Sequence, residues 1–97
     1  MDKLFIKPEH LKMLTDILGS YCPKAEVFAY GSRLNGNAHE GSDLDLAIKF
    51  NEEGKYLFEL KEIISQSNIP FLVDIHEYNN LPDSFQKEIL KNYIVIF

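Results

Sequence analysis

The chain has 97 residues, 45% of them hydrophobic, and a formal net charge of −5 with a pI near 5.1. This length predicts one small domain with a single core, and this apolar fraction argues against intrinsic disorder. The acidic balance argues against the broad basic face that nucleic-acid-binding proteins use, so no direct nucleic-acid binding is expected. A nucleotide can still bind, because divalent metals can neutralise its phosphates.

Cysteine content and hydropathy indicate the compartment. The single cysteine, Cys22, cannot form an internal disulfide. The chain has no signal-like start and no apolar segment long enough to span a membrane. We therefore expect a cytoplasmic protein in a reducing compartment, without membrane association.

The first third of the chain predicts a helix followed by a strand. Residues 8–20 have the pattern of a helix, because Pro8 suits a first helical turn and three leucines follow at helical spacing. The segment from Gly19 to Pro23 ends this helix. Residues 25–30 form a short apolar run that predicts the first strand.

Residues 43–50 show the clearest alternation in the chain. Every second residue is apolar, which predicts a strand with one face on the core. The open face then carries Asp43 and Asp45, which lie two strand residues apart, or ~6–7 Å along the backbone. The core-facing set is Leu44, Leu46, Ile48 and Phe50.

The remaining half predicts a helix, a strand, a helix and an apolar tail. The helix spans residues 55–67, and the third strand spans residues 70–76. A last helix opens near Pro82 and runs to about Lys91, with Phe85 and Ile89 facing inward. The tail, residues 93–97, suits an edge strand.

Asp74 is a lone acid inside the otherwise apolar third strand. A buried carboxylate without a partner is costly, so Asp74 is expected to face a metal ion, a base or solvent. Beside the strand of Asp43 and Asp45, it would complete a cluster of three carboxylates. These would raise one another's pKa, and one or two Mg²⁺ ions, or Mn²⁺, would relieve the repulsion.

The loop between the first two strands begins with Gly31-Ser32, a turn that can bring backbone N–H groups against a phosphate. Arg33, the only arginine, follows directly. Its guanidinium can grip a phosphate as a bidentate fork. The alternative, of equal weight, is that Arg33 pairs with Asp43 or Glu40 and orders the loop.

Three other polar residues allow more than one interpretation. Ser42 is a candidate nucleotide contact or a cap for the turn before the aspartates. His39 lies in a loop rich in glycine and asparagine, where solvent exposure is expected. His76 shares a strand face with Asp74, so it either lines the site or is a surface histidine.

The combined motif is Gly31-Ser32, ten residues, then Asp43-Leu44-Asp45, with Asp74 on a later strand. It resembles the signature of the DNA polymerase β-like nucleotidyltransferase superfamily, and within it the minimal nucleotidyltransferases. The resemblance covers nearly the whole chain, so residues 1–97 are expected to form a single minimal nucleotidyltransferase domain. It implies an α/β (α+β) fold in which helices flank a mixed β-sheet.

The resemblance also implies residue roles. Asp43 and Asp45 would hold two Mg²⁺ ions, and Asp74 would ligate one of them and help to deprotonate the attacking hydroxyl. Gly31 and Ser32 would contact the β- and γ-phosphates of a nucleoside triphosphate. The reaction would transfer a nucleoside monophosphate and release pyrophosphate.

Partners follow from the same resemblance. Many such proteins are antitoxins encoded beside a HEPN-domain toxin, and some transfer AMP from ATP to a tyrosine of that toxin. The partner expected here is therefore a separately encoded helical protein, HEPN-type or substrate-binding. Many of these motifs carry a second arginine where this chain has Asn35, which weakens the expected phosphate grip. The alternative function is a nucleotide-binding module that neutralises or scaffolds a helical partner by contact.

Overall fold

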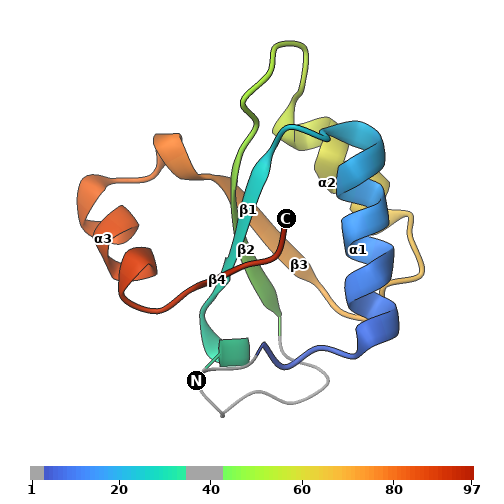
Figure 1. The fold of residues 1–97 in the computed structure, drawn as a ribbon, viewed down its shortest axis with the longest axis horizontal. Helices are drawn as coiled ribbons and strands as arrows, with labels where there is room; N and C mark the ends of the chain where they lie inside the picture. Colours follow the sequence, from blue (N-terminus) through green and yellow to red (C-terminus); the bar gives the residue numbers. More distant parts are fainter. Residues whose placement is uncertain (1–3, 35–42) are drawn as a thin grey trace.

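A mixed sheet of four strands separates two helical layers in the computed structural model, which describes residues 4–34 and 43–97 (Figure 1). The strand order is β3-β2-β1-β4. β1 pairs with β2 and with β4 in antiparallel fashion, whereas β2 and β3 are parallel. The elements in chain order are α1 (Pro8–Tyr21), β1 (Glu26–Tyr30), the 3₁₀ turn η1 (Ser32–Leu34), β2 (Leu44–Lys49), α2 (Leu57–Ser65), β3 (Val73–Glu77), the 3₁₀ turn η2 (Tyr78–Asn80), α3 (Asp83–Lys91) and β4 (Ile94–Val95).

One face of the sheet carries the main core, under α1 and α2 (Figure 1). The leucine stripe of α1 supplies Leu14 and Leu18, which are fully buried. The apolar alternation of β2 supplies Leu44, Leu46 and Ile48 to the same cluster. α2 also provides the crossover that two neighbouring parallel strands require.

The opposite face carries a smaller core under α3 and η2. Phe28 of β1 and Ala47 of β2 pack there against Tyr78 and Ile89. The polar side of β2 therefore faces this second layer, which covers the sheet only in part.

The expected architecture of a mixed sheet flanked by helices is confirmed. The third strand is shifted, because its ladder with β2 begins at the Leu44–Val73 pair and residues 70–72 precede it. The expected edge strand is β4, beside β1. Phe85 was expected to face inward, but its side chain remains 41% exposed and its ring makes an edge contact with Tyr30. None of the helices in the described ranges is long and apolar enough to cross a membrane.

Candidate active site

Two aspartates from neighbouring strands lie side by side on the sheet. The parallel register pairs Asp45 of β2 directly with Asp74 of β3. Paired residues project from the same face, and Asp45 alternates in step with Ala47, which packs under α3. Asp43 precedes β2 by one residue and is exposed. The register thus joins Asp74 to the Asp-x-Asp motif.

The charges of these carboxylates act on one another. The pKa of Asp45 is raised, first by burial and then by the negative charges of Asp74 and Asp43. His76 opposes this shift. Burial and charge crowding together make Asp45 a carboxylate that would gain from a nearby cation.

His76 lies next to Asp74. Its Nε2 atom is 3.1 Å from Oδ1 of Asp74, and both side chains are partly exposed. The sequence left open whether His76 lines the site or is a surface histidine. This contact places it at the edge of the carboxylate row. The imidazole can orient the Asp74 carboxylate through this contact.

Tyr30 belongs to the same row, and the motif did not point to it. The antiparallel register pairs Tyr30 of β1 with Asp45, so Tyr30, Asp45 and Asp74 cross three strands in line. Burial, Asp45 and Asp74 together raise the pKa of Tyr30 to about 12. The phenol therefore stays protonated at physiological pH and offers a hydroxyl donor beside the acids. The feature of the sequence that could have pointed to Tyr30 is its position at the end of the first strand, directly before Gly31.

Gly31 brings the turn after β1 against the Asp45 carboxylate. Its φ of +87° is a conformation that side chains with a Cβ rarely adopt. A Cβ at this position would also lie 3.2 Å from Cγ of Asp45 and closer still to its Oδ2 atom. Glycine is therefore required twice, by the backbone and by the neighbouring carboxylate.

Arg33 lies in η1, two residues after Gly31, and is buried. Its Nη1 atom donates a hydrogen bond to the carbonyl oxygen of Phe5, and its guanidinium lies over the ring of Phe71. Burial lowers the pKa of its guanidinium, and the charge of Asp43 opposes this shift. An ion pair of Arg33 with Asp43 or Glu40 that orders the loop stays a prediction. A phosphate contact by Arg33 stays a prediction.

Several sequence predictions lie outside the described residues. These are the roles of Ser42 and His39, the possible Glu40 partner of Arg33, and the position of Asn35. The Ser32 backbone belongs to η1, but its side chain is also outside what the structure describes.

The chemistry of the carboxylate row suits Mg²⁺. Within residues 4–34 and 43–97, no group of three or more His, Cys, Asp or Glu side chains is assembled to hold a metal ion. Mg²⁺, however, usually takes one or two carboxylates together with substrate phosphates, and Asp45 and Asp74 provide such a pair. The convergence of all three aspartates on metal stays a prediction.

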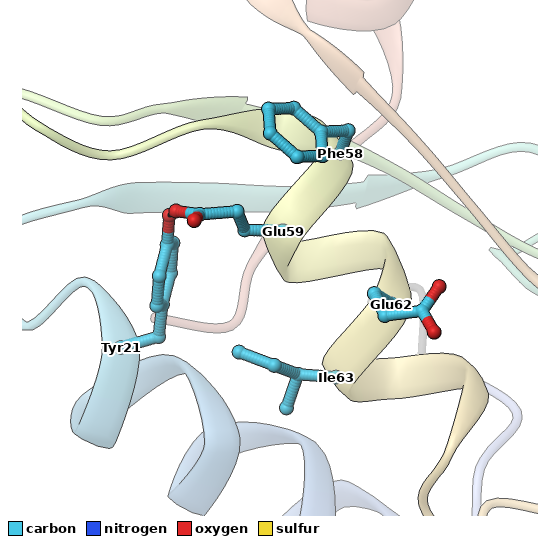
Figure 2. Close-up of a pocket in the computed structure, with 5 residues that line it drawn as sticks. All are labelled: Tyr21, Phe58, Glu59, Glu62 and Ile63. Carbon is cyan, nitrogen blue, oxygen red and sulfur yellow. Dashed lines mark hydrogen bonds between the residues drawn. The ribbon is translucent and has the colours of Figure 1, made fainter.

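A separate hollow of about 460 Å³ lies between α1 and α2, on the other side of the sheet (Figure 2). The Tyr21 hydroxyl points to Glu59 and donates to its Oε1 atom at 2.5 Å, and the backbone N–H of Tyr56 donates to the Tyr21 oxygen at 2.8 Å. These bonds tie α1 to α2. The sheet therefore separates this hollow from the carboxylate row.

Comparison with known proteins agrees with this geometry. Residues 12–97 match the family model described as "Polymerase beta, Nucleotidyltransferase". The chain is also 40% identical over 96 residues to a Haemophilus influenzae protein named "Probable protein adenylyltransferase MntA". That alignment covers 97% of this chain and 84% of the relative.

Proposed function

Since the chain belongs to the polymerase beta nucleotidyltransferase family and is an enzyme of that class, we propose that it transfers AMP from ATP to a hydroxyl group of a partner protein. The observation that carries this proposal is the direct pairing of Asp45 with Asp74 beside the Gly31 turn. The choice of AMP and of a protein acceptor follows the name of the Haemophilus influenzae relative.

The reaction assigns tasks to Asp74 and to the turn of Gly31 and Ser32. The acceptor oxygen attacks the α-phosphorus, the bond from that phosphorus to the oxygen bridging to the β-phosphate breaks, and pyrophosphate leaves. Asp74, at the more accessible edge of the row, takes up the hydroxyl proton. The backbone N–H groups of Gly31 and Ser32 would hold the β- and γ-phosphates.

Asp43, Asp45 and Asp74 would hold Mg²⁺ in this scheme. The metal would supply charge neutralisation for the triphosphate and for the departing pyrophosphate. The raised pKa of Asp45 supports this assignment, because a carboxylate crowded by other carboxylates is stabilised as an anion by a cation.

The proposed acceptor is a tyrosine of a separately encoded helical protein of the HEPN type, the toxin of a toxin–antitoxin pair. Leu90, Tyr93 and Val95, around the end of α3 and the edge strand β4, leave apolar surface exposed. Such surface supports association with another protein. Addition of AMP to a tyrosine of the toxin would silence it.

Co-expression with the product of the neighbouring gene tests this proposal. Size-exclusion chromatography reports the complex, and intact mass after incubation with ATP and Mg²⁺ reports one added AMP. Parallel reactions with labelled ATP, GTP, CTP and UTP identify the base. A complex without added mass would instead support the nucleotide-binding module that neutralises its partner by contact, and no complex would remove the antitoxin role.

Charge-removing variants test the residue roles. Asp43→Asn and Asp45→Asn should abolish transfer while the protein stays folded, because each removes a metal-ligand charge from a residue that is exposed (Asp43) or half-buried (Asp45). Asp74→Asn should lower kcat more than it raises KM for ATP, because Asp74 acts on the hydroxyl. Parent-like transfer rates in these variants would rule out the carboxylate mechanism.

A further inference from the structure

We propose that Arg33 is a positioning residue, which fixes the phosphate-binding turn to the N-terminal segment and to the segment that leads into β3, and is not a phosphate ligand. The inference rests on the proposed function only in taking the Gly31 turn as the triphosphate site. It chooses between two roles that the motif alone leaves open, and it adds aromatic partners that the motif does not contain.

Arg33 and Phe5 are joined by a reciprocal pair of hydrogen bonds. The Phe5 backbone N–H donates to the Arg33 carbonyl oxygen at 2.8 Å, and Arg33 Nη1 donates to the Phe5 carbonyl oxygen at 2.5 Å. Two segments 28 positions apart in sequence are thus connected through backbone and side chain of one residue. The N-terminal segment before α1 is held on the turn.

The guanidinium is also enclosed by aromatic rings. Its central carbon lies 4.1 Å from the centroid of the Phe71 ring and 5.8 Å from that of Phe5. His10 of α1 contacts the Phe71 ring edge-on, with centroids 5.7 Å apart. A planar, weakly hydrated guanidinium can stack flat on an aromatic ring while it donates hydrogen bonds at its edge. A lysine ammonium is also attracted to aromatic rings, but it cannot reproduce this combination.

The burial of Arg33 argues against direct contact between its guanidinium and a phosphate. Arg33 is 2% exposed and is the only buried charged residue in the part of the chain that the structure describes. Burial lowers the pKa of its guanidinium, and the Asp43 carboxylate opposes this. A bidentate phosphate contact requires an exposed guanidinium edge, which this arrangement does not present.

The position of Arg33 links both halves of the site. The Leu34 N–H donates to the Gly31 carbonyl oxygen at 3.0 Å, so residues 31–34 form one short turn. At one end of this turn Gly31 rests on Asp45, and near the other end Arg33 stacks on Phe71, three residues before Asp74. A shift of Arg33 therefore moves the turn relative to both carboxylate strands.

A double-mutant cycle with Arg33→Lys and Phe71→Leu tests the inference. Amide hydrogen exchange at Leu34 and Phe5, measured without nucleotide, reports the order of the turn. Each single variant should speed exchange at both amides by about tenfold, and the double variant by no more than the faster single variant, because both remove one shared contact. Phe50→Leu is the matched control, since Phe50 is another partly buried ring of the main core, whereas the rings stacked on Arg33 are Phe71 and Phe5.

Transfer kinetics give the second readout. Both single variants should lower kcat/KM for ATP by about tenfold, and their effects should be non-additive. Arg33→Lys should therefore lose activity although it retains the positive charge. If Arg33 were a phosphate ligand, Phe71→Leu would leave the KM for ATP unchanged. Arg33→Lys would then keep part of the activity, because lysine retains the charge. Unchanged exchange at Leu34 and Phe5 in both variants would overturn the inference. Hydrogen exchange needs neither ATP nor an acceptor protein. If the parent protein showed no transfer activity, the proposed function would be refuted, but the exchange experiment would still test the role of Arg33.

Discussion

Two separate features of the structure require glycine at position 31: the backbone conformation there and the neighbouring Asp45 carboxylate. The positive φ disfavours any residue with a Cβ, and the Asp45 side chain occupies the space that a Cβ would need. Gly54 also has a positive φ, of 77°, but among the described residues nothing lies within 4 Å of where its Cβ would be. Comparison of Gly31 with Gly54 therefore distinguishes the effect of backbone strain from the effect of contact with Asp45.

Alanine substitution should therefore cost more at Gly31 than at Gly54. Gly54→Ala should lower the free energy of unfolding by about 1 kcal/mol, from backbone strain alone. Gly31→Ala should lower it by about 2–4 kcal/mol, because displacement of Asp45 adds to that strain. Urea unfolding measures both, and equal losses would contradict the contact with Asp45. In an Asp45→Ala background the excess loss at Gly31 should disappear.

Asp45 gives a pH-dependent prediction. Its pKa is raised above the usual value near 3.8, so the folded state holds the proton more tightly than the unfolded state. The associated stability is present below that usual pKa and is lost as pH rises through the raised pKa. Asp45→Asn should thus match the parent Tm at low pH and exceed it increasingly toward pH 7. Thermal melts from about pH 3.5 to 7 measure this, and a Tm advantage confined to low pH would contradict it.

Among the elements, α3 packs on the face of the sheet that carries the carboxylates. It rests on the sheet through Ile89, which is 2% exposed, whereas the next residue, Leu90, is 49% exposed. Phe85 touches Tyr30 edge-on, with ring centroids 5.9 Å apart. A buried anchor and an aromatic contact therefore position α3 beside the row of acids.

Truncation of the anchor should destabilise the protein far more than truncation of its neighbour. Ile89→Ala should lower the free energy of unfolding by about 2–4 kcal/mol, because it leaves a cavity under α3. Leu90→Ala should change it by less than about 0.5 kcal/mol. Denaturant unfolding compares the two variants, and similar losses would mean that α3 does not pack on the sheet through Ile89.

For the whole molecule, the net charge of −5 and the carboxylate row favour cation binding in the folded state. Mg²⁺ should raise Tm, because a ligand that binds only the folded state stabilises it by about 2.7 kcal/mol at a concentration of about 100 Kd. Asp74→Asn should reduce this shift strongly. Asp16→Asn is the matched control, since Asp16 pairs with Lys12 on the surface of α1. Equal Mg²⁺ shifts in both variants would indicate general charge screening.

Local patterns in the sequence were sufficient for much of the fold. The helical spacing of leucines predicted α1 to within one residue, and the alternation of residues 43–50 placed Asp45 on the polar side of β2. These patterns have periods of about 3.6 and 2 residues, so a short window contains the whole signal. The spacing of Gly31-Ser32 and Asp43-x-Asp45 is likewise a property of one continuous stretch, and it was enough to indicate the family that the comparisons then established.

The tertiary structure alone decided which distant residues meet. The parallel register set Asp74 beside Asp45, and the antiparallel register added Tyr30 to the row. Packing buried Arg33 against Phe5, in the segment before α1, and Phe71, in the segment before β3. Strand register and side-chain burial depend on the fit between segments tens of residues apart, and no periodicity within a single segment encodes that fit.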